Sequence, residues 1–86
     1  MKNLEKTLKA LANRRRLAIL AYLKTHKEAS VTDIAHAIHL SFKATSKHLG
    51  ILASLDIIDR EQRSLQMFYR LANSQPSPVK SILLLL

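Results

Sequence analysis

The chain has 86 residues, no cysteine, and a hydrophobic fraction of 48%. This length predicts one domain, and the hydrophobic content excludes a disordered body. Disulfides, thiolate nucleophiles and thiolate metal sites are excluded because they require cysteine. Fourteen Lys and Arg against six Asp and Glu give a net charge of +8, which predicts either attraction to polyanions such as nucleic acid or an ordinary solubilising surface.

Residues 1–12 carry a charge every few positions, unlike a secretory signal. The apolar run at 82–86 has five residues, far short of the ~20 that cross a bilayer. We therefore expect a soluble protein of the cytoplasm without a membrane partner.

The first two predicted helices follow from leucine spacing. Leu4, Leu8 and Leu11 recur at helical intervals among lysines, which predicts a short amphipathic helix. Asn13 is a suitable N-cap for a second helix that continues to about His26. Its wide apolar face predicts the most buried helix of the domain.

Two further helices follow a polar break at residues 25–29. Residues 32–38 form about two helical turns, and Ser41 is placed to cap a fourth helix over 42–55. The link at 39–41 has the length that a helix-turn-helix uses.

After residue 56 the apolar period changes from 3.6 to 2. Residues 57–62 and 65–71 are predicted to be strands, joined at Arg63-Ser64 by a loose turn because no Asn-Gly or Asp-Gly is present. The chain then divides into a domain, a Ser/Pro linker and a short apolar helix or tail, at residues 1–72, 73–78 and 79–86.

The fourth helix has two unlike faces. Helical geometry places Thr45, Leu49 and Leu52 on the inner face, with Phe42 beside them. The opposite face carries two cations, a hydroxyl and a glycine: Lys43, Lys47, Ser46 and Gly50. Such a face fits the major groove of DNA, where lysine donates to guanine. A solvated surface with two lysines is the alternative.

Arginines provide two further sets of cations. Arg60, Arg63 and Arg70 on the hairpin are able to contact phosphates or a minor groove, and the hairpin carboxylates of Asp59 and Glu61 are expected to point away from DNA. The run Arg14-Arg15-Arg16 has two equally supported interpretations. Either it contacts phosphates, or one arginine pairs with Asp56, Glu28 or Glu5 and the others are solvated.

Four blocks of the sequence resemble transcriptional regulators of the ArsR/SmtB (arsenic-repressor) type. They are residues 8–20 (LKALANRRRLAIL), 30–35 (SVTDIA), 40–52 (LSFKATSKHLGIL) and the hairpin segment 56–71. The match covers residues 4–72 almost without gaps, about four-fifths of the chain. It implies a mostly α winged helix-turn-helix: a three-helical core, an N-terminal helix, a β-hairpin wing and a short C-terminal helix.

The resemblance also implies function. It predicts a sequence-specific regulator of double-stranded DNA, a repressor, with helix 42–55 in the major groove and the wing 57–71 on the flanking backbone or minor groove. The implied recognition positions are Ser41, Lys43, Ala44, Ser46, Lys47 and His48, to which the cations Arg14, Arg15, Arg60 and Arg63 add backbone contacts. Members form homodimers through their first and last helices, which here offer Leu4, Leu8, Ile82, Leu83, Leu85 and Leu86.

The chain departs from the family where metals bind. The two cysteines of the helix-three metal box fall on Ser30-Val31-Thr32, so soft-metal sensing is lost there. His36 and His39 are three residues apart and able to share one metal, but two imidazoles without thiolate or carboxylate support make a weak site. We expect ordinary surface histidines, and neither a metal nor a cofactor.

Other functions are weighed against this one. An enzyme needs a nucleophile–base pair, paired carboxylates or a glycine-rich phosphate loop, and the sequence has none of these. A winged helix that binds protein or RNA without operator specificity is the main alternative. Salt separates the two, because DNA binding through several phosphates weakens steeply with salt. Membrane-surface association is a third possibility, with an apolar run too short to anchor alone.

Overall fold

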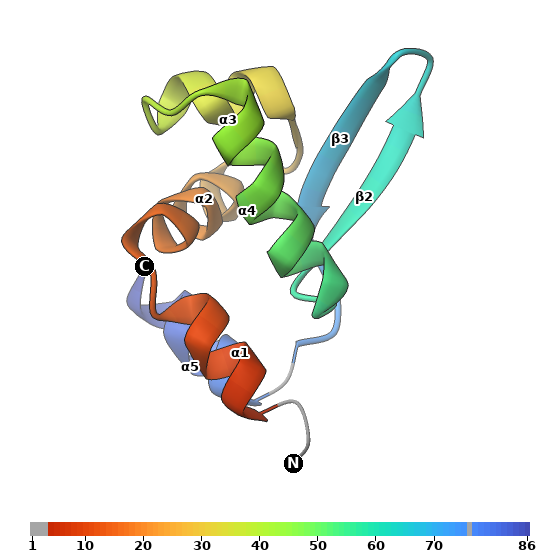
Figure 1. Cartoon of the computed structure of the whole chain (residues 1–86). Helices are drawn as coiled ribbons and strands as arrows, with labels where there is room; N and C mark the ends of the chain where they lie inside the picture. The colour runs from red at the N-terminus through yellow and green to blue at the C-terminus, as the bar shows by residue number, and fades with distance from the viewer. Residues whose placement is uncertain (1–3, 76) are drawn as a thin grey trace.

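The computed structural model describes residues 4–75 and 77–86. Its elements follow in the order α1 (Leu4–Leu11), α2 (Arg14–Thr25), β1 (Ala29–Ser30), α3 (Val31–Ala37), α4 (Phe42–Ser54), β2 (Ile58–Arg63), β3 (Gln66–Leu71) and α5 (Ser77–Leu85). The β2–β3 hairpin projects beside α4, and α1 and α5 lie together at the end away from the hairpin turn (Figure 1). The predicted mostly helical chain with a β-hairpin is confirmed.

Three helices begin at side chains that cap their free backbone N–H groups. Asn13 Oδ1 accepts hydrogen bonds from the backbone N–H groups two and three residues later, at 3.0 and 3.1 Å. Ser30 Oγ and Ser41 Oγ each accept from the N–H three residues later, at 3.1 Å. The predicted caps at Asn13 and Ser41 are confirmed, and α3 begins one residue before its predicted start.

The turns after α3 and α4 have the same construction. His39 takes a left-handed φ of 55°, and the N–H of Leu40 donates to Ala35 O at 3.0 Å. After α4, Asp56 takes φ 59° and the following N–H donates five residues back at 3.1 Å. This backbone arrangement ends a helix abruptly and is usually built with glycine. It directs the chain from α3 into α4, and from α4 into the hairpin.

The core lies between α2, α3, α4 and the base of the hairpin. Leu49, Leu52 and Thr45 are fully buried, which confirms the predicted inner face of α4. Phe42 is different: its residue surface is 60% exposed, and its predicted place beside the buried side chains is wrong. The first turn of α4 extends beyond the core, so a residue on the inner arc of the helix still meets solvent there.

The hairpin turn is tighter than predicted and lies one residue later. Arg63 pairs with Gln66 at the end of the antiparallel ladder, which leaves Ser64-Leu65 as a two-residue connection. Ser64 has a φ of 57°, a left-handed conformation that allows the tight turn. The short strand β1, which the sequence analysis did not predict, pairs antiparallel with β3 through Ala29 and Tyr69.

The C-terminal helix starts two residues earlier than predicted and joins the same core. Val79 is fully buried, and α5 packs against α1 and α2. Lys24 Nζ donates to Leu83 O at 2.7 Å, which ties the end of α2 to α5. Across residues 4–75 and 77–86, no helix combines the length and apolar character that a membrane crossing requires.

Candidate nucleic-acid interface

The exposed face of α4 carries the predicted cations. Lys43 and Lys47 are exposed, and none of the ion pairs formed within residues 4–75 and 77–86 includes them. Ser41 is exposed at the N-cap, whereas Ala44 and Ser46 are half-buried. The residues of α4 include no carboxylate. This face is therefore positively charged and available to an anionic partner.

His48, in the middle of α4, contacts α2. Arg16 Nη1 lies 3.1 Å from His48 Nδ1. Because a guanidinium only donates, Nδ1 is the acceptor, and the neutral ring carries its proton on Nε2. Partial burial lowers the pKa of His48 below its ordinary 6.5, and the charges of Arg16, Arg15 and Lys47 lower it further. His48 is thus a neutral ring whose Nε2–H is able to donate.

Arg16, which was not among the predicted site residues, makes contacts within the chain. It also donates to the backbone carbonyls of Ala10 and Lys9 in α1. The guanidinium therefore joins three helices: α1, α2 and α4. Neither Asp56, Glu28 nor Glu5 is its partner, so the carboxylate pairing considered for this arginine run is replaced by carbonyl and imidazole contacts.

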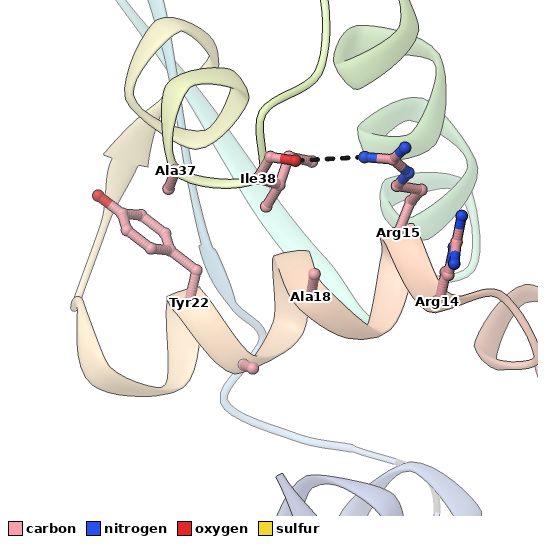
Figure 2. Close-up of a pocket in the computed structure, with 7 residues that line it drawn as sticks. Arg14, Arg15, Ala18, Tyr22, Ala37 and Ile38 are labelled. Atoms are coloured by element: carbon pink, nitrogen blue, oxygen red, sulfur yellow. Dashed lines mark hydrogen bonds between the residues drawn. The ribbon is translucent and has the colours of Figure 1, made fainter.

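Arg15 connects α2 to the turn that precedes α4. Its Nη1 donates to Ile38 O at 3.3 Å, and Figure 2 shows the side chain extending from α2 to that carbonyl. The bond crosses one end of a cavity of about 540 Å³, with Tyr22 at the other end and Ala18 between them. Arg14 is exposed at the same end as Arg15. One arginine of the pair therefore supports the turn, and the other faces solvent.

The hairpin arginines, unlike the α4 lysines, are mostly engaged by carboxylates. Arg63 contacts Glu28 at 2.7 Å and Glu61 at 3.1 Å, and Arg70 contacts Glu61 at 3.2 Å. These hydrogen bonds lower the pKa of Glu61 and raise the pKa of Arg63. The Arg63 guanidinium also lies 4.8 Å from the centre of the Phe68 ring. Arg60 is exposed, and no ion pair in the described ranges includes it.

Gly50 lies on the outer side of α4 above a shallow cavity. A Cβ at this position would meet nothing within 4 Å. The cavity, of about 250 Å³, separates α4 from the base of β2 and is lined in part by Asp59 and Arg60. No close packing among the described residues therefore explains a glycine here, and the half-buried position leaves space beside the helix.

The positions of the family's metal box and the two histidines considered as ligands have different surroundings. Ser30 Oγ caps α3, Val31 is buried, and Thr32 is exposed. His36 and His39 are exposed. In the part of the chain that the structure describes, no group of three or more His, Cys, Asp or Glu is arranged to hold a metal ion.

Four of the six predicted dimer residues, Leu8, Ile82, Leu85 and Leu86, line one apolar cavity between α1 and α5. Leu8 is 48% exposed and Leu85 is 81% exposed, although both are apolar. The cavity, of about 310 Å³, is also lined by Leu11, Ala12 and Leu17. Leu4 and Leu83, the other two predicted dimer residues, are half-buried. Leu84, which was not predicted to lie at the dimer interface, is 81% exposed. An apolar face of this kind favours a protein partner.

Comparison with known proteins assigns the chain to a family. Residues 13–60 match the family described as bacterial regulatory protein, arsR family. The transcriptional activator HlyU of Vibrio cholerae serotype O1 is 35% identical over 68 residues, which are 79% of this chain. The match spans 62% of that protein, less than two thirds of its length.

Solved structures agree in fold. HlyU from Vibrio cholerae superposes with a TM-score of 0.81 at 32% identity, over 98% of this chain and 87% of that one. The homodimeric winged helix-turn-helix DNA-binding domain of a possible ArsR-family regulator from Mycobacterium bovis gives 0.81 at 30%, over 98% and 74%. The transcriptional repressor PagR of Bacillus anthracis gives 0.77 at 28%, over 99% and 98%. These matches confirm the winged helix-turn-helix fold and a regulator rather than an enzyme.

Proposed function

Because the chain belongs to the arsR family of bacterial regulatory proteins, we propose that it binds specific sequences of double-stranded DNA as a homodimer and represses transcription. The observation that carries the proposal is the exposed face of α4, with Lys43 and Lys47 free of carboxylates beside a projecting hairpin. In a helix-turn-helix this helix enters the major groove, where lysine donates to guanine O6 and N7.

The N-cap of α4 and its other proposed recognition positions each have a distinct role in this proposal. Ser41 lies at the helix start, where its exposed hydroxyl and the nearby N–H groups favour a phosphate. Ala44 and Ser46 are half-buried and suit close approach to base edges. His48 donates from Nε2, because Arg16 occupies Nδ1.

Backbone contacts come from two further groups of cations. Arg14 and Arg15 lie at the start of α2, and Arg15 supports the turn before Ser41. Arg60 and Arg63 extend the contact onto the wing, where Arg63 exchanges its carboxylates for phosphate. Contacts to phosphate position the protein, and contacts to base edges select the sequence.

A repressor is proposed over an activator because of coverage. In the structural comparison, the repressor PagR is matched over 98% of its length and 99% of this chain, and the activator HlyU over 87% of its length and 98% of this chain. We also infer that the α3 position does not sense a soft metal. Hydroxyl and aliphatic groups replace the thiolates that such metals prefer, and Ser30 Oγ already caps α3.

Selection of bound duplexes from a random pool at near-physiological salt tests the function. We expect a palindromic consensus, because a twofold dimer places two recognition helices on half-sites one turn apart or a multiple of it. Affinity should fall steeply as salt rises. Transcription from a promoter that overlaps the selected sequence should fall when the protein is added. Failure to enrich any duplex, or salt-independent binding to protein or RNA, would contradict the proposal.

The homodimeric relative from Mycobacterium bovis supports a dimer, and we propose that it forms through the apolar α1/α5 face. Leu85→Glu should convert the dimer to a monomer in sedimentation equilibrium, because a buried unpaired charge is strongly unfavourable. Helical circular dichroism should be retained, since Leu85 is 81% exposed in the single chain. Lys80→Glu, an exposed change on the same helix, is the matched control and should stay dimeric. An unchanged sedimentation profile for Leu85→Glu places the interface elsewhere.

A further inference from the structure

The largest exposed apolar side chains fall at two opposite ends of the described part of the chain. Leu8, Leu84, Leu85 and Leu86 lie on α1 or at the end of α5, the face proposed for the dimer. Phe42 and Leu65 lie at the other end, at the first residue of α4 and in the hairpin turn (Figure 1). Their residue surfaces are 60% and 96% exposed. The proposed dimer face leaves these two side chains without a partner.

Phe42 is held in the open by the start of α4. Ser41 Oγ fixes the first turn by accepting from the Ala44 N–H at 3.1 Å. Between Phe42 and the hairpin lies a cavity of about 270 Å³, lined also by Leu65 and Met67. Phe42 lies one turn before Ser46, on the side of α4 where the inner arc meets the arc that carries Ser46. The aromatic ring therefore extends the proposed recognition surface toward the N-terminal end of the helix.

The chemistry of phenylalanine limits what it is able to recognise there. The N-terminal residues of a helix-turn-helix recognition helix contact base edges. Phenylalanine has no hydrogen-bonding group, and the apolar group on a base edge of the major groove is the C5-methyl of thymine. We propose that Phe42 contacts a thymine methyl in each half-site and is a specificity-determining residue. The inference rests on the proposed DNA-binding function and adds one contacted base in each half-site.

Deoxyuridine scanning of the selected duplex tests the contact. Deoxyuridine lacks only the C5-methyl, so each replacement of thymine removes one methyl and leaves base pairing intact. We expect one thymine per half-site at which the replacement weakens binding about fourfold, the value for burying a single methyl-sized group. Replacement at both symmetric positions should weaken binding about 16-fold if the two effects add. Fluorescence anisotropy measures the Kd.

Phe42→Ala identifies the side chain responsible. The variant should bind the thymine duplex more weakly and should bind thymine and deoxyuridine duplexes equally. Its melting temperature should hardly change, because Phe42 is mostly exposed. Phe42→Leu, which keeps an apolar group, should restore part of the methyl dependence. Leu65→Ala is the matched control, since Leu65 is the other exposed apolar residue at this end, and it should keep the full dependence.

Each outcome separates this inference from the proposed function. A selected duplex without a methyl-sensitive thymine, or an undiminished methyl effect in Phe42→Ala, overturns the Phe42 contact and leaves DNA binding intact. Loss of the methyl effect in Leu65→Ala alone assigns the contact to the wing and also overturns it. Failure to enrich any duplex overturns the proposed function together with the contact, and favours a protein partner for the exposed Phe42.

Discussion

The cations of α4 and those of the hairpin have opposite surroundings. Lys43 and Lys47 project from a helix that contains no carboxylate. Arg63 and Arg70 share Glu61, and Arg63 also contacts Glu28, 35 positions earlier in the chain. Both regions are basic in sequence, yet among the described residues α4 keeps both of its lysines out of ion pairs, whereas the hairpin keeps only Arg60 out of them. Local composition therefore does not reveal which positive groups are available to a partner.

Because of this difference, we expect α4 and the hairpin to contribute differently to DNA binding. The hairpin ion pairs are exposed, and such pairs contribute about 0–1 kcal/mol, so a phosphate is able to displace the carboxylates. Until then, the contact between Arg63 and Glu28 restrains the hairpin against the segment before β1. We expect α4 to supply most of the affinity and the hairpin to supply orientation and a smaller, adjustable share.

The largest expected effect on DNA affinity comes from replacing both lysines of α4. Lys43→Ala combined with Lys47→Ala should weaken binding to the selected duplex about 100-fold, about tenfold for each lost contact. The slope of log affinity against log salt should fall by about two, one for each cation removed. Melting should be unchanged because both side chains are exposed. Lys80→Ala, on α5 at the other end, is the control. Normal binding by the double variant would remove α4 from the interface.

A smaller effect, with the opposite sign, is expected on the hairpin. Glu61→Gln frees Arg70, removes one of the two carboxylates that contact Arg63 and takes away a negative charge, so it should tighten DNA binding about three- to fivefold and steepen the salt dependence. Glu5→Gln is the matched control, because Glu5 is an exposed carboxylate on α1 that pairs with Lys9 at 3.9 Å. Weaker binding by Glu61→Gln would mean that the ion pairs shape the wing for DNA and do not compete with it.

Local signals in the sequence account for most of the fold. Leucine spacing and the capping residues Asn13 and Ser41 place the helices to within one or two residues, because both signals act over a single turn. The same periodicity misplaces Phe42, since it gives an angle around the helix and not the extent of the core along it. Strand β1 has two residues, too few for an alternating pattern.

The missing parts of the candidate site depend on long-range contacts and on unusual backbone. Arg16 and His48 are 32 positions apart, and no spacing rule pairs them. Nor does the sequence show that Arg63 is occupied by Glu28. The left-handed residues His39 and Asp56 end α3 and α4 where glycine is usual, so a search for glycine finds neither turn. The sequence thus identifies the helix that we propose for recognition, and the fold determines which of its neighbours are engaged.

The smallest expected effect concerns the contact between α2 and α4. Burial and then the charges of Arg16, Arg15 and Lys47 lower the pKa of His48 in the folded chain below 6.5. The unfolded chain therefore binds a proton at a higher pH than the folded chain, and the free energy of unfolding should fall as pH drops through about 6.5. Above that range both states hold a neutral ring, and this contribution is constant.

Urea unfolding at pH 7.5 and pH 5.5 measures the effect, with His48→Gln compared against His36→Gln. His36 is exposed, so its replacement should leave the loss of stability at the lower pH as it is in the natural chain. His48→Gln should lose less stability between the two pH values, because no ring beside Arg16 remains to be protonated. Equal losses in both variants would show that the Arg16–His48 contact tolerates an imidazolium, and that a neutral His48 is not required to hold α4 against α2.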